Sequence, residues 1–186
     1  MTVKSTTSLG PYNRYVIWAQ GCLKRCPGCI SKDSQPLEGG YERSITELAD
    51  EIIDTPGIEG ITISGGEPFL QAEGFADLIE KVRLIRDIGV IVYTGFTFGE
   101  ISQTKLAEVC DMVIDGTYIE ELNDGLSLRG SSNQKIYLIT ERYKEEAKTL
   151  YGTDGRKVEV RINGNNAMLI GIPDKDSLQI FKIRRI

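Results

Sequence analysis

Short apolar runs alternate with longer amphipathic stretches over most of this 186-residue sequence. The apolar runs fit strands, and the stretches between them carry apolar residues at helical spacing. Strands separated by helices of roughly 10–15 residues predict βαβ units and therefore a mostly parallel sheet. We predict an α/β fold, and a chain of this length is sufficient for one domain with a real core.

The predicted elements follow one another from residue 15 to residue 172. The expected strands are residues 15–18, 61–63, 90–93, 112–114 and 136–139. The expected helices are residues 44–53 and 97–109, each beginning at a capping box, together with 75–85 and 141–150. Near the end of the chain, residues 157–162 and 167–172 are expected to form a β-hairpin around residues 163–166.

The sequence contains no histidine. Its absence excludes Ser-His-Asp and Cys-His catalysis and His-ligated zinc hydrolysis, so a cofactor is the obvious source of reactivity.

The net charge of −5 comes from interspersed charges, and no basic stripe predicts a nucleic-acid partner. No apolar run approaches the roughly 20 residues of a membrane helix, and Met1–Gly10 lacks the apolar stretch of a signal peptide. We therefore expect a cytoplasmic protein with no membrane partner.

Three cysteines, Cys22, Cys26 and Cys29, lie close together directly after the first predicted strand. In the cytoplasm, such a cluster favours metal or redox chemistry over disulfides. Thiolates are the usual ligands of iron–sulfur clusters, and three local ligands leave one iron of a four-iron cubane without a protein ligand. An open coordination site is typical of a catalytic metal. The sequence therefore predicts a catalytic [4Fe–4S] cluster on this loop.

Two other interpretations of the cysteine loop remain open. The first is a zinc knuckle whose fourth ligand is Cys110, although a lone cysteine at an apolar helix end is usually a small buried hydrophobe. The second is a non-catalytic iron–sulfur electron carrier, which would normally supply all four ligands.

The Cys-x3-Cys-x2-Cys motif, followed by Gly65-Gly66-Glu67-Pro68 after the second strand, resembles the radical S-adenosylmethionine (SAM) superfamily. The resemblance implies a partial (β/α) barrel with about five to six mostly parallel strands. It also implies that SAM chelates the unique iron and is cleaved reductively to methionine and a 5′-deoxyadenosyl radical. One departure is Gly28, which stands where many members carry an aromatic residue near the adenine.

The loops after the predicted strands are expected to meet at one edge of the sheet and to bind SAM there. In the family, the Gly-Gly-Glu-Pro turn binds the SAM amino group; its glycines allow close approach of the backbone, and its proline fixes the turn. Thr94 is equally well interpreted as part of a helix-capping segment. Asp115 is equally well interpreted as an ordinary acidic residue of a loop. The candidate cofactor-binding residues are Gly65, Gly66, Glu67, Pro68, Thr94, Asp115, Arg129 and Asn133.

Residues 115–122 and 128–134, with the short runs that begin at Trp18 and Val92, resemble the activating enzymes of anaerobic ribonucleotide reductase. This resemblance covers about residues 9 to 139. It implies a large glycyl-radical subunit as partner, whose glycine loses a hydrogen atom to the deoxyadenosyl radical. It also implies an electron donor of the flavodoxin or ferredoxin type.

The sequence beyond Thr140 extends past the usual end of these small activating enzymes. We expect a core domain of residues 1–151 and a C-terminal β extension of residues 152–186 that packs on it. The extension is interpreted as a structural cap, or as a hairpin edge that binds an extended peptide by strand addition. The second interpretation gives an alternative function, the modification of a ribosomally synthesised peptide.

Overall fold

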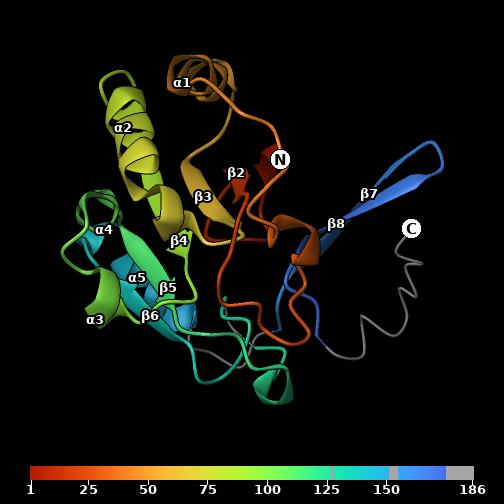
Figure 1. The fold of residues 1–186 in the computed structure, drawn as a ribbon. Helices are drawn as coiled ribbons and strands as arrows, with labels where there is room; N and C mark the ends of the chain where they lie inside the picture. Colours follow the sequence, from red (N-terminus) through yellow and green to blue (C-terminus); the bar gives the residue numbers. More distant parts are fainter. Residues whose placement is uncertain (127, 151–154, 175–186) are drawn as a thin grey trace.

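Six strands form one mixed sheet in the computed structural model, which describes residues 1–126, 128–150 and 155–174 (Figure 1). The strands are β1 (Thr2–Thr6), β2 (Arg14–Ala19), β3 (Gly60–Gly65), β4 (Gly89–Tyr93), β5 (Met112–Asp115) and β6 (Lys135–Leu138). They lie side by side in chain order; β2 to β5 are parallel, whereas the edge strands β1 and β6 pair antiparallel with their neighbours. The predicted α/β fold with a mostly parallel sheet is confirmed.

The main helices cover one face of this sheet. They are α1 (Ile45–Asp54), α2 (Ala72–Arg83), α3 (Phe98–Ile101) and α4 (Lys105–Val109). Helix α5 (Lys144–Leu150) follows β6 and comes directly after Tyr143, which packs in an apolar cluster on the opposite face. Helix α2 packs against both α1 and α4. Parallel strands that follow one another in chain order, joined by right-handed crossovers, place their helices on the same face. This arrangement is compatible with the partial barrel, which stays a prediction. None of the helices in the described ranges is long and apolar enough to cross a membrane.

Alternate residues of the parallel strands point to opposite faces of the sheet. On the helical face, the register neighbours Ile17, Ile63 and Val92 join the side chains of α1, α2 and α4 in the largest apolar cluster. The opposite face carries smaller apolar clusters, one around Ile91 and one around Val16. The core therefore continues through the sheet to its second face.

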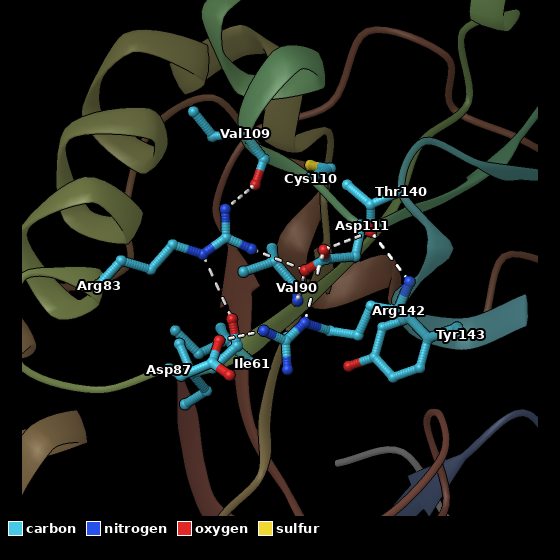
Figure 2. Close-up of polar contacts among 12 residues, drawn as sticks. Ile61, Arg83, Asp87, Val90, Val109, Cys110, Asp111, Thr140, Arg142 and Tyr143 are labelled. Atoms are coloured by element: carbon cyan, nitrogen blue, oxygen red, sulfur yellow. Dashed lines mark hydrogen bonds and ion pairs between the residues drawn. The ribbon is translucent and has the colours of Figure 1, made fainter.

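A buried carboxylate joins the elements at the amino-terminal edge of the parallel strands (Figure 2). Asp111 is 4% exposed and accepts hydrogen bonds from the Val90 amide at 2.7 Å and the Thr140 hydroxyl at 2.7 Å. Its carboxylate also pairs with Arg83 at 2.6 Å and lies 3.6 Å from the Arg142 guanidinium. This network connects α2, β4 and the segment after β6. It therefore stabilises the edge of the sheet opposite the carboxyl ends of the parallel strands.

The predicted C-terminal hairpin is confirmed as a separate two-stranded sheet of β7 (Val158–Asn163) and β8 (Asn166–Gly171). In Figure 1 the far end of this hairpin projects away from the main sheet. The expected boundary between residues 151 and 152 lies outside the described residues, so the division into a core and an extension stays a prediction.

Two features of the fold differ from the sequence-based expectations. Strand β1 was not predicted, yet Val3 is buried and pairs with Val16 of β2. The single helix expected over residues 97–109 is wrong, because α3 and α4 are separated by a turn. The Thr104 hydroxyl donates to the Ile101 carbonyl and accepts from the Ala107 amide, so Thr104 begins a new helix within the predicted one.

Candidate cofactor site

The three cysteines that follow β2 all have free thiols, are partly exposed and line the same pocket. Backbone hydrogen bonds hold both ends of their loop, from the Gly21 amide to the Ser34 carbonyl at 2.8 Å and from the Cys22 amide to the Gln35 carbonyl at 2.9 Å. The Cys29 amide donates to the Cys26 carbonyl at 3.2 Å, which tightens the middle of the loop. The loop is therefore ordered by its own backbone, and its thiols remain available for a metal cluster.

The pocket lies at the carboxyl ends of the parallel strands, where the loops that follow the strands were expected to meet. Besides the cysteines, it is lined by Gly65 and Gly66 at the end of β3, Thr94 after β4 and Gly116 after β5. The pocket opens to solvent beside the cysteine loop, so a ligand can reach the three thiols from outside.

Gly66, directly after β3, touches the backbone at both ends of the cysteine loop. The Gly66 amide donates to the Ala19 carbonyl at 2.9 Å, and the Glu67 amide donates to the Gly21 carbonyl at 2.7 Å. A Cβ atom on Gly66 would lie 2.3 Å from the Gly21 carbonyl oxygen and 2.6 Å from that of Ser34. Glycine is therefore required at residue 66 to let the second loop approach the loop that carries the cysteines.

We expect Gly66→Ala to lower the iron content of the reconstituted protein, because the added methyl group displaces the ends of the cysteine loop. Gly74→Ala is the matched control, since Gly74 lies in α2 with no atom within 4 Å of the added methyl group. That variant should keep its iron and gain about 0.5–1 kcal/mol of stability from the higher helix propensity of alanine. Iron analysis and thermal unfolding measure both results; full iron content in Gly66→Ala would contradict the assignment.

Glu67 is 1% exposed and connects the loops after β3 and β4. Its carboxylate accepts hydrogen bonds from the Thr94 hydroxyl and the Gly95 amide, both at 2.8 Å, and from the Phe69 amide at 3.1 Å. Burial raises the pKa of this carboxyl above its usual value, and the three donors oppose that rise. Glu67 and Thr94 therefore both line the pocket, as predicted, and are hydrogen-bonded to each other.

The remaining predicted residues do not line this pocket. Pro68 is buried at the start of the short 3₁₀ helix η2 (Pro68–Gln71). Asp115 accepts from the Phe98 amide at 2.6 Å. Arg129 pairs with Asp124 at 3.1 Å, and the Asn133 side chain donates to the Thr117 carbonyl at 2.9 Å. Asp115, Arg129 and Asn133 have polar partners elsewhere in the protein and Pro68 is buried, so the contacts of these four residues with SAM stay predictions.

Several lining residues were not among the sequence candidates. Tyr93, at the end of β4, has a buried hydroxyl with no hydrogen-bond partner in the described part of the chain, and burial raises its pKa. The Lys24 ammonium lies 4.3 Å from the centre of the Phe96 ring. Tyr118 and Asn123 come from the loop after β5. The position of Tyr93 at the end of a predicted strand could have identified it as a pocket residue. Asn123 lies in a loop whose position cannot be predicted from the sequence.

Cys110 lies beside Val109 and Asp111 (Figure 2), at the opposite edge of the sheet from the other cysteines. It lies two residues before the start of β5, whereas the cysteine loop follows β2, which runs in the same direction. Its side chain is fully buried, its thiol donates to the Leu106 carbonyl at 2.9 Å, and burial raises its pKa, which keeps it protonated. The zinc site that shares Cys110 is therefore wrong, and the expectation that Cys110 is a small buried hydrophobe is confirmed.

The residues around the pocket fit a cubane and a bound SAM molecule. No three His, Cys, Asp or Glu side chains of the described ranges are placed around a single ion. A cubane does not need such convergence, because each thiolate binds a different iron. The unpartnered Tyr93 hydroxyl and the glycine backbones give the pocket polar groups for a further ligand.

These features define an iron–sulfur protein with a ligand pocket beside its cysteine loop. A family model described as a 4Fe-4S single cluster domain matches residues 9–137. The anaerobic ribonucleoside-triphosphate reductase-activating protein of Vibrio cholerae is 34% identical over 142 residues, which cover 70% of this chain and 91% of the relative. Its Escherichia coli K12 counterpart is 30% identical over 142 residues, 69% of this chain and 90% of the relative. The chain therefore belongs to the family of these activating proteins.

A second kind of relative shares a shorter region. The pyruvate formate-lyase-activating enzyme of Listeria monocytogenes is 40% identical over 87 residues, 44% of this chain and 34% of the relative. Family membership confirms the radical SAM resemblance, with a [4Fe–4S] cluster and SAM as the cofactors.

Proposed function

We propose that this chain activates an anaerobic ribonucleotide reductase by removing a hydrogen atom from a glycine of the large reductase subunit. The observation that carries the proposal is the pocket in which three free thiols and the Gly-Gly-Glu loop meet. The reductase-activating relatives are matched over about nine tenths of their length, and the pyruvate formate-lyase-activating relative over about a third. The reductase is therefore the favoured partner.

The chemistry needs one electron for each glycine that is activated. With the cluster and SAM bound, the net reaction converts SAM, one electron and a glycine Cα–H into methionine, 5′-deoxyadenosine and a glycyl radical. We propose a flavodoxin- or ferredoxin-type protein as the source of the electron, as the family resemblance implies.

We assign the protein's own groups to parts of this task. Cys22, Cys26 and Cys29 hold three irons of the cluster. The Glu67 carboxylate, buried at the pocket wall and already fixed by three donors, offers negative charge to the SAM ammonium group. The Tyr93 hydroxyl is free to donate a hydrogen bond to the bound cofactor. Because both groups are held before the ligand arrives, binding orients SAM at little cost in entropy.

The direct test mixes the anaerobically reconstituted protein with SAM, a one-electron reductant and the large reductase subunit from the same organism. We expect a doublet electron paramagnetic resonance signal of a glycyl radical on the large subunit, with one 5′-deoxyadenosine formed per radical. Omission of SAM is the control and should give no doublet. Cleavage of SAM that leaves the reductase subunit without a radical would contradict the proposed partner.

A further inference from the structure

The segment that leaves β8 reaches the cofactor pocket. Ile172 and Pro173 both line the pocket that contains the three cysteines. They lie beyond residues 9–137, the region matched by the family model. The C-terminal extension of this chain therefore supplies part of the site's wall, in addition to its own hairpin.

The position of this segment is fixed by the core. Ile170 is fully buried in an apolar cluster with Val3 and Val16, on the face of the sheet opposite α1 and α2. Gly171 has a φ of +119°, and a Cβ atom there would lie 2.7 Å from the Lys157 carbonyl oxygen. Because this backbone turn accepts only glycine, the chain leaves the hairpin in one direction and delivers Ile172 to the pocket.

A hydrogen-bonded latch connects the segment to the loop after β5. The Asn123 side-chain amide donates to the Pro173 carbonyl and to the Tyr118 hydroxyl, both at 3.3 Å. Its oxygen accepts from the Arg156 guanidinium, which also donates to the Gly130 carbonyl at 3.3 Å. Tyr118 and Cys26 line the same pocket. These hydrogen bonds therefore join Pro173 to the loop after β5, which also lines the site.

The wall that this segment forms has the chemistry of a nucleoside site. Ile172 packs in the same cluster as Tyr93, whose hydroxyl is buried and has no partner in the described ranges. An apolar surface beside a free hydroxyl suits a planar base joined to a sugar. The charged methionine end of SAM suits the other part of the pocket, where Glu67 and the cysteines lie.

We propose that Ile172 and Pro173 bind the nucleoside part of SAM and that Asn123 is the positioning residue that holds them there. The inference rests on the proposed function, because it takes SAM as the ligand. It assigns a binding role to the extension, which was expected to act as a structural cap or a peptide-binding edge. Removing apolar surface from Ile172 then weakens SAM binding and leaves the cluster intact.

The experiment measures the dissociation constant of SAM by equilibrium dialysis on the full-length, anaerobically reconstituted protein. For Ile172→Ala we expect an increase of about tenfold, because the three carbon groups removed are only partly buried and count as roughly two buried methylene groups. Ile172→Val should restore most of the affinity, because it keeps the branched surface. Ile162→Ala is the matched control on the same hairpin, where the isoleucine is 78% exposed, and its dissociation constant should equal that of the wild type.

A second variant tests the latch. Asn123→Asp keeps the shape and the acceptor for Arg156 but replaces the amide that donates to Pro173. We expect faster hydrogen exchange in the segment after β8 and weaker SAM binding, with unchanged iron content. If the wild-type protein cleaves SAM but Ile172→Ala and Asn123→Asp both bind SAM with wild-type affinity, this inference is overturned and the proposed function is not. A wild-type protein that holds iron yet binds no SAM would overturn the proposed function and this inference together.

Discussion

Replacing Cys26 with alanine should abolish both cluster assembly and reductive cleavage of SAM. Cys26 lies in the middle of the three-thiol loop, and removing its thiolate leaves two ligands, too few to retain a cubane on this loop. The measurement is iron and sulfide content after anaerobic reconstitution, together with 5′-deoxyadenosine formed in the presence of a reductant. We expect iron to fall to background and the product to disappear.

Cys110→Ser is the matched control for this variant. The Cys110 side chain lies in the core at the other edge of the sheet and bonds the Leu106 carbonyl, a contact that a serine hydroxyl can also make. Its iron content and its rate of SAM cleavage should match those of the wild type. Loss of iron from Cys110→Ser, or retention of a full cluster by Cys26→Ala, would contradict the ligand assignment.

Removing the Asp111 carboxylate should lower the free energy of unfolding by about 3–5 kcal/mol, the usual cost of breaking a buried ion pair. Asp111→Ala leaves the Val90 amide and the Thr140 hydroxyl without their acceptor and removes the carboxylate that pairs with Arg83 (Figure 2). Urea denaturation of the purified chain, followed by circular dichroism, measures the change.

Asp87→Ala provides the control for this second prediction, because Asp87 pairs with Arg142 at the surface. The Asp87 side chain is 83% exposed, and exposed pairs contribute about 0–1 kcal/mol. A loss of similar size in both variants would show that burial does not decide the strength of this network. A change below about 1 kcal/mol for Asp111→Ala would contradict its structural role.

The helical and strand patterns were sufficient to predict β2 to β6, but not the edge strand β1 or the direction of β6. Ile61, Ile91 and Val113 lie in apolar runs that fix the parallel strands. Strand β1 has a single valine among polar residues, so only its pairing with β2 reveals it. The reversed direction of β6 is set by tertiary packing after a long loop, and hydrophobic periodicity carries no information on strand direction.

The cysteine loop and the Gly-Gly-Glu turn were predictable because their residue types and spacing carry chemistry directly. The role of Glu67 in tying two loops together was not, since its partners Thr94 and Gly95 come from a different strand. Asn123 was missed for a similar reason. It acts through contacts with Arg156 and Pro173, which are far from it in sequence and close only after folding.

The central claim is a four-iron cluster with one iron open to SAM, and electron paramagnetic resonance of the reduced protein tests it most directly. Anaerobically reconstituted protein should contain about four irons per chain, and its reduced-cluster signal should change shape when SAM is added. A signal that is unaffected by saturating SAM would contradict the claim. A correctly folded, iron-free protein with zinc on the cysteine loop would contradict it as well.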